Sequence, residues 1–137
     1  MPLVSITRIV RFNAAHRVYN PAWDDARNAA TFGKCNNPNW HGHNYSLEVT
    51  VEGEVEAETG FVVNLGDVKA VAQREIVEAV DHKNLNLDVP WMAGIIPSTE
   101  NLVVACWNQL APRVAPARLK KLRLWETENQ YVEYEGR

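Results

Sequence analysis

Strict alternation of two residue classes between positions 41 and 52 is the feature that most constrains how this chain folds. The even positions are small or polar, and the odd positions are His41, His43, Tyr45, Leu47, Val49 and Val51. Side chains two apart on a β-strand share a face, so this pattern predicts a half-buried strand. Both imidazoles then lie on its inward face, at the edge of a core, where they can converge on a metal ion.

A second alternating run, near the N-terminus, supplies a third imidazole. Its apolar phase runs from Val4 to Phe12, and His16 stays in that phase if the strand continues past Asn13. We therefore expect His16 to face the same interior as His41 and His43. Three neutral imidazoles without a fourth protein ligand are typical of a catalytic zinc site, in which the fourth position takes water or substrate.

Two other interpretations of these histidines remain open at this point. A histidine on an apolar face is more often a hydrogen-bonded core residue than a metal ligand, and this applies most to His16. It applies less to His41 and His43, because two desolvated imidazoles side by side need two partners. A closed structural site, with Cys35 as the fourth ligand, also fits the spacing.

Size and charge favour small-molecule chemistry. The 137 residues are enough for one core, so we expect a single domain over residues 1–137. The net charge is −3 and the longest basic run is Lys120–Lys121, which predicts no binding to nucleic acid or to an anionic membrane. No charged leader precedes an apolar segment, and no apolar stretch approaches the ~20 residues that span a bilayer, so we expect a cytoplasmic protein.

The rest of the pattern predicts an α+β domain: a four-stranded antiparallel sheet with two longer helices on one face. Open sheet edges favour assembly over a free monomer. Cys106 shares a helical face with Leu102 and Leu110, and we expect both it and Cys35 to be reduced thiols. The other expected elements are a helix at 22–32 capped by Asn20, a short strand at 61–63, a helix from Asn64 to about Asp81, a helix from Ser98 or Thr99 to before Pro112, and a hairpin of 119–126 with 131–134.

Three further side chains are candidates for chemistry. Cys35 is a base or nucleophile only as a thiolate, and a zinc ion or imidazolium nearby would lower its pKa from about 8.5. His82, directly after Asp81, is the histidine left to carry protons. Glu126 shares the inward phase of Leu124, where an ionised carboxylate needs a hydrogen-bonding or cationic partner. A solvent-exposed histidine and a strand-end glutamate reaching solvent fit the same positions equally well.

Five segments together resemble the 6-pyruvoyl-tetrahydropterin synthase family, and the resemblance covers nearly the whole chain. The five residues between Cys35 and His41 match this family, whereas related 6-carboxy-tetrahydropterin synthases commonly have a shorter gap. Trp40 stands where the family usually has glycine. The segments are FNAAHR at 12–17, FGKCNNPNWHGHNY at 32–45, VDHKNLN at 80–86, STEN at 98–101 and WETEN at 125–129.

The resemblance implies an architecture and an activity. The architecture is the tunnelling fold, in which trimers close a twelve-stranded barrel and stack head to head as hexamers, with sites between subunits. The activity is a zinc-dependent, triphosphate-eliminating lyase that converts 7,8-dihydroneopterin triphosphate to 6-pyruvoyl-tetrahydropterin, in tetrahydrobiopterin-type biosynthesis. It implies one Zn²⁺ per chain, Mg²⁺ with the triphosphate, and no external redox cofactor.

The resemblance also implies roles for individual residues. His16, His41 and His43 would bind zinc, and Cys35 would be the general base. Asp81 and His82 would complete its proton relay. Glu126 would anchor the amino and N3 edge of the pterin ring, in a pocket that Thr99 and Glu100 line.

Three rival functions remain at this stage. A 6-carboxy-tetrahydropterin synthase of queuosine biosynthesis would use the same substrate and residues but release a product of different mass. A thiol hydrolase built on Cys35 and His82 would work without zinc, so chelation would not affect it. A pterin-binding protein, or one with a closed structural zinc site, would hold metal without turnover.

Overall fold

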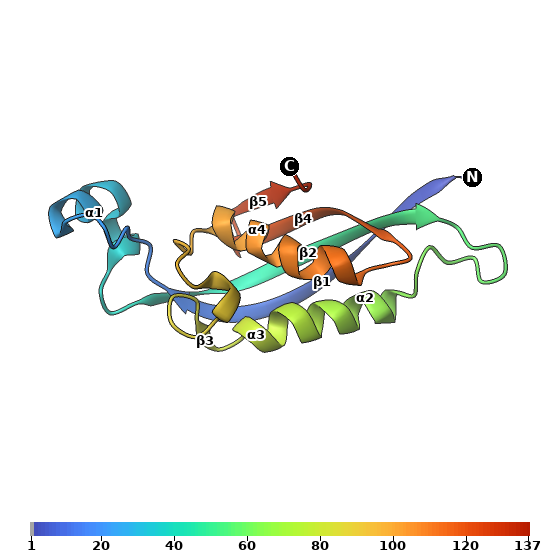
Figure 1. The fold of residues 1–137 in the computed structure, drawn as a ribbon, viewed down its shortest axis with the longest axis horizontal. Helices are drawn as coiled ribbons and strands as arrows, with labels where there is room; N and C mark the ends of the chain where they lie inside the picture. The colour runs from blue at the N-terminus through green and yellow to red at the C-terminus, as the bar shows by residue number, and fades with distance from the viewer. Residues whose placement is uncertain (1) are drawn as a thin grey trace.

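A computed structural model describes residues 2–137 and contains a five-stranded sheet built on one long hairpin-like pair (Figure 1). Strands β1 (Leu3–His16) and β2 (His41–Glu54) pair antiparallel along their whole length, with Leu3 opposite Glu54 and His16 opposite His41. The strand order is β3-β1-β2-β4-β5. The remaining strands are β3 (Lys83–Asn84), β4 (Arg118–Thr127) and β5 (Gln130–Tyr134).

The sheet differs from the predicted four-stranded antiparallel one in three respects. It has five strands in the described residues, and it is mixed, because β3 lies parallel to the end of β1. Two residues are too few to show a period of two; backbone hydrogen bonds from His82 to Asn13 and from Leu85 to Ala15 place β3 there instead. The strand expected at 61–63 was wrong: this segment follows a turn at Gly60 (φ 75°) and forms no ladder.

Two helical segments cover one face of the sheet, as expected. The first comprises α2 (Leu65–Ala72), a π-helical turn (Gln73–Val77) and α3 (Glu78–Val80), and the Asn64 side chain caps it by accepting from the Gly66 N–H. The second is α4 (Thr99–Leu110), where Ser98 accepts from the Asn101 N–H. Both predicted helices are confirmed, although the π-helical turn was not foreseen.

The smaller helix α1 (Asp25–Phe32) begins three residues later than expected. Asp24 is the cap, because its side chain accepts from the Arg27 N–H, whereas the Asn20 side chain closes a turn with the Ala22 N–H. Gly33 ends the helix with φ 56°. In Figure 1, α1 lies at one end of the molecule and the loop after β2 at the other. Short 3₁₀ turns occupy Gly33–Asn36, Pro90–Met92 and Ala111–Arg113.

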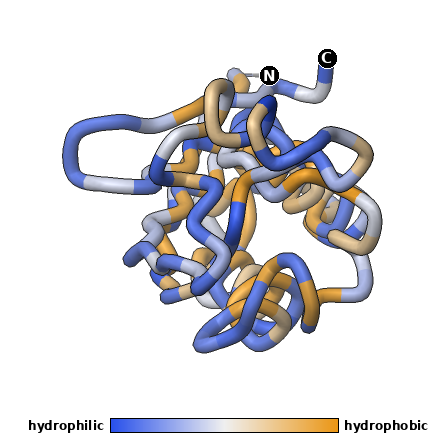
Figure 2. The backbone as a smooth tube through the Cα atoms, turned by 90° about the vertical axis from the view of Figure 1, so that its left-hand side faces the viewer, coloured by the Kyte–Doolittle hydropathy of each residue, from blue (hydrophilic) through white to orange (hydrophobic). Residues whose placement is uncertain are grey.

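The core lies between the helices and the inward face of the sheet. Alternating hydropathy is visible along the backbone in Figure 2. Burial raises the pKa of the Cys106 thiol to about 12, and both cysteines are free thiols, as predicted. Among residues 2–137 no helix is both long and apolar enough to cross a membrane. Buried helix residues include Val68, Ala72, Ile76, Val80, Leu102, Cys106 and Leu110, and buried strand residues include Phe12, Tyr45, Leu47, Val49, Val51, Leu122 and Leu124.

Candidate metal centre

Three imidazoles meet where β1 ends and β2 begins. His16 lies directly opposite His41 in the ladder, and His43 is two residues further along β2 on the same face. The ring centroids are 4.5 Å apart for His16 and His41, 5.1 Å for His16 and His43, and 5.0 Å for His41 and His43. One ligating atom from each residue lies within 4.8 Å of the other two. The predicted convergence of the three histidines is therefore confirmed.

The hydrogen bonds of this cluster leave ring nitrogens for a metal. His16 is 1% exposed, and its Nδ1–H donates to the Pro97 carbonyl at 2.8 Å. Among the described residues, Nε2 of His16 and Nδ1 of His41 are buried without a hydrogen-bond partner. Buried polar atoms are normally paired, so these two indicate a ligand.

The electrostatics of the cluster also suit a metal. Burial lowers the pKa of both His16 and His41, and the neighbouring imidazoles lower each further. The neutral imidazole is the form that ligates metal ions. The residues present therefore fit a three-histidine zinc site.

A carboxylate lies beside the histidines. Glu126, near the end of β4, has a side chain that is 16% exposed, and its Oε1 lies 3.8 Å from Nε2 of His43. Its Oε2 accepts from the Thr99 hydroxyl, and its Oε1 accepts from Nε2 of Gln130 at 3.1 Å. Glu126 is therefore held by hydrogen bonds rather than extended into solvent. It lines a recess of about 260 Å³ together with Thr99, Glu100, Gln130, Tyr131 and Val132.

Asp81 and His82 form a hydrogen-bonded pair where α3 ends. Asp81 accepts from the Asn13 N–H at 2.8 Å and from Nδ1 of His82 at 3.0 Å, and these bonds hold the pKa of its carboxyl below the ordinary value. The His82 side chain is 82% exposed. The pair is thus tied to β1 while its imidazole remains accessible.

Cys35 lies apart from both groups. It belongs to the 3₁₀ turn Gly33–Asn36 and is exposed, and its carbonyl accepts from the Val18 N–H. In the described part of the chain it does not join the three-histidine group, and its thiol forms no hydrogen bond with Asp81 or His82. A single chain therefore does not form the closed site with Cys35 as fourth ligand.

Comparison with known proteins identifies the family. The family model described as 6-pyruvoyl tetrahydropterin synthase matches residues 5–137. The 6-pyruvoyl tetrahydrobiopterin synthase of Homo sapiens is 44% identical over 131 residues, which is 96% of this chain and 90% of the human protein. The chain belongs to the 6-pyruvoyl tetrahydropterin synthase family. The resemblance drawn from the motifs is confirmed, and the chain is a lyase of this type.

Two further comparisons agree with this assignment. The 6-pyruvoyl tetrahydrobiopterin synthase of Drosophila melanogaster is 38% identical, over 98% of this chain and 81% of the fly protein. The structure of Caenorhabditis elegans 6-pyruvoyl tetrahydropterin synthase superposes with a TM-score of 0.94 at 36% identity, covering 100% of this chain and 98% of the other. The α+β fold of the family is thus confirmed for one chain.

Sequence reasoning missed two contacts of this synthase-family site. The predicted hairpin arms, 119–126 and 131–134, put Gln130 in the turn, but it begins β5 and bonds to Glu126 four residues earlier. The Pro97 carbonyl orients His16 from 81 residues away, and no local pattern points to it. Trp40 stands in place of the family's usual glycine, and its φ of 69° is a conformation that glycine adopts without strain.

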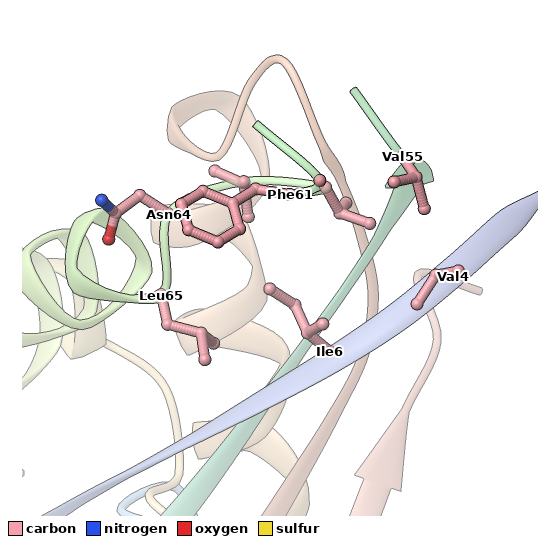
Figure 3. A pocket seen from close by; sticks show the side chains of 9 residues that line it. Val4, Ile6, Val55, Phe61, Asn64 and Leu65 are labelled. Atoms are coloured by element: carbon pink, nitrogen blue, oxygen red, sulfur yellow. The ribbon is translucent and has the colours of Figure 1, made fainter. Parts of the chain in front are cut away.

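An apolar pocket of about 290 Å³ lies at the other end of β1 (Figure 3). Val4 and Ile6 line it, together with residues of the loop after β2 such as Phe61 and Leu65. Val4 is twelve positions from His16 along one strand, which corresponds to about 40 Å at the rise of a β-strand. No acid, base or cysteine lines this pocket, so we place the chemistry at the histidine end.

Proposed function

We propose that this chain is a zinc-dependent 6-pyruvoyl-tetrahydropterin synthase that converts 7,8-dihydroneopterin triphosphate with elimination of triphosphate. The observation that carries the proposal is an open three-histidine cluster beside a hydrogen-bonded carboxylate. This arrangement occurs in a chain 44% identical to the human synthase. One domain over residues 1–137 contains all the residues concerned.

The proposed metal and substrate roles are those that the family resemblance implies, and the geometry of this end of the sheet supports them. His16, His41 and His43 would hold one zinc ion per chain. Zinc bound there would acidify hydroxyl groups of the substrate side chain and the C–H bonds beside them. Glu126 would accept hydrogen bonds from the amino and N3 donors of the pterin, with Thr99 and Glu100 lining the recess. Mg²⁺ would accompany the triphosphate.

The proton-transfer roles fall to Cys35, Asp81 and His82. Asp81 accepts from Nδ1 of His82, which leaves Nε2 of that ring to accept a proton. Cys35 would remove protons from the substrate side chain as a thiolate. Because no hydrogen bond joins Cys35 to this pair among the described residues of one chain, we assign the complete relay to contacts between subunits.

The proposed assembly is a hexamer made of two trimers. β3 covers only Ala14 and Ala15 of β1, so most of that edge is open in the described chain, and β5 forms the other edge. Open edges present unpaired backbone groups that a second copy can pair. Closing trimers through these edges would give the barrel of the tunnelling fold.

One experiment tests the proposed reaction. Purified protein is incubated with 7,8-dihydroneopterin triphosphate, with and without prior chelation of zinc, and the products are weighed by mass spectrometry. We expect 6-pyruvoyl-tetrahydropterin and triphosphate from the zinc-loaded protein alone. The mass of 6-carboxy-tetrahydropterin would favour the alternative synthase, and turnover that survives chelation would favour a thiol hydrolase.

A further inference from the structure

The Glu126 carboxylate lies beside one of the three candidate metal ligands, His43. With zinc bonds of about 2.0–2.1 Å, neighbouring ligand atoms of a tetrahedral site are about 3.4 Å apart. Oε1 of Glu126 is 3.8 Å from Nε2 of His43, which is close to that spacing. Carboxylates are common zinc ligands, so a small movement of this side chain would close the site.

Two hydrogen bonds oppose that movement, one on each oxygen. Oε2 accepts from the hydroxyl of Thr99, which is 7% exposed and begins α4. Oε1, the oxygen near His43, accepts from the side-chain amide of Gln130. Gln130 pairs with Thr127 across the two-residue turn between β4 and β5, so the hairpin itself sets its distance from Glu126.

We propose that Gln130 is a positioning residue that keeps Glu126 out of the metal's coordination shell. It bonds Oε1, the oxygen nearest the histidines, and holds it 3.8 Å from Nε2 of His43. The fourth position then stays open, and the carboxylate stays available to a ligand with N–H donors. This inference rests on the three-histidine metal site proposed above.

A neutral amide suits this role better than a cation would. A lysine or arginine at position 130 would form a charge-assisted bond with Glu126, which is roughly twice as strong as a bond between neutral groups. An incoming ligand would then have to break that ion pair. The Gln130 amide carries no charge, so a donor-bearing ligand can replace it on Oε1.

Cobalt and azide test the inference without any turnover. Co²⁺ replaces zinc in the full-length protein, and azide is titrated while the visible absorption bands of the cobalt are followed. The wild-type protein should bind one Co²⁺ per chain, and azide should shift its bands. Gln130→Met keeps the side-chain length but removes the donor, and we expect its azide affinity to fall about ten- to hundredfold, the range typical of lost outer-shell partners.

Further variants show whether Glu126 causes the loss of azide affinity. In the double variant Gln130→Met with Glu126→Gln, no carboxylate is left to close the site, so azide affinity should return to within about threefold of wild type. Gln130→Ser, whose hydroxyl is too short to reach Glu126, should behave as Gln130→Met. Asn129→Ser, in the same turn, should bind azide as the wild type does.

Two outcomes would overturn the inference about Gln130, and a third would overturn the proposed metal site. If Gln130→Met and Gln130→Ser bind azide as tightly as the wild type, Gln130 does not position Glu126 and the inference fails. It also fails if affinity is lost but the double variant does not recover it. If the wild-type protein binds no Co²⁺ at the histidines, the proposed metal site itself is wrong.

Discussion

At the scale of single residues, two residues beside the candidate site have left-handed backbone conformations. Trp40, with φ 69°, directly precedes His41, and His82, with φ 60°, follows Asp81. This conformation costs a residue with a Cβ atom about 1–2 kcal/mol relative to glycine. Such conformations persist where contacts with the surrounding structure hold them in place, commonly at functional sites. Here they set how the chain enters β2 and how it leaves the helical segment.

Position 40 should prefer glycine to alanine. Because the backbone is left-handed there, we expect Trp40→Gly to be more stable than Trp40→Ala by about 1 kcal/mol, as measured by urea denaturation. At a site with ordinary φ the order is reversed, because glycine loses more conformational freedom on folding. An alanine variant as stable as the glycine variant would contradict the conformation of Trp40.

Asp81 should make stability depend on pH. The Asn13 N–H, and then His82, hold the pKa of its carboxyl below the ordinary value of 3.8. A lowered folded-state pKa stabilises the fold above that ordinary value, and the effect is lost as pH falls through the folded-state pKa.

The measurement compares wild type with Asp81→Asn by urea denaturation at several pH values. We expect wild type to be the more stable at neutral pH, and the difference to shrink below about pH 4. A wild-type advantage that grows on acidification would contradict the assignment.

Cys35 should act as a proton-transfer base. Cys35→Ala should retain zinc and substrate binding while turnover falls about 10²–10⁴-fold, as is typical of a lost general base. Metal analysis, binding titration and the rate with 7,8-dihydroneopterin triphosphate measure the three quantities. A near-normal rate, or a pterin adduct on Cys35 in enzyme quenched during turnover, would contradict the role.

At the scale of elements, the N-terminus of α4 connects the three-histidine cluster with the carboxylate. Pro97, just before the helix, orients His16, and Thr99, its first residue, holds Glu126. Ser98 lies between them and caps the helix. One helix start therefore sets the position of one imidazole of the histidine cluster and of the carboxylate beside that cluster.

Loss of this cap should affect both stability and the site. We expect Ser98→Ala to lower the free energy of unfolding by about 1 kcal/mol and to weaken metal binding, because Pro97 and Thr99 lose a fixed position. Chemical denaturation and a metal titration measure the two effects. Ser98→Thr keeps a capping hydroxyl and should have the stability and metal affinity of the wild type. If the alanine and threonine variants are equal in both quantities, the cap contributes to neither.

At the scale of the whole molecule, the sheet has two edges that one chain leaves open. We expect sedimentation at micromolar concentration to show a hexamer, because pairing of these edges satisfies backbone groups that are otherwise unpaired. A proline at Ile9, on the open stretch of β1, should shift the population toward smaller species. A wild-type species with the mass of one chain would contradict the proposed assembly.

The sequence by itself determined the elements that carry the site. A period of two placed His16, His41 and His43 on inward faces, and the cap at Ser98 located the start of α4. These signals are local, because neighbouring side chains on one strand or helix face have fixed directions. Motifs spread over the chain then indicated the family.

Only the tertiary structure decided how these elements touch one another. Pro97 reaches His16 across 81 residues, β3 joins the sheet through two residues, and both Thr99 and Gln130 hold Glu126. Cys35, close to His41 in sequence, does not join the histidine group. Periodicity states which face a side chain is on. Which atoms meet across that face depends on how separate elements pack, and no local pattern contains that information.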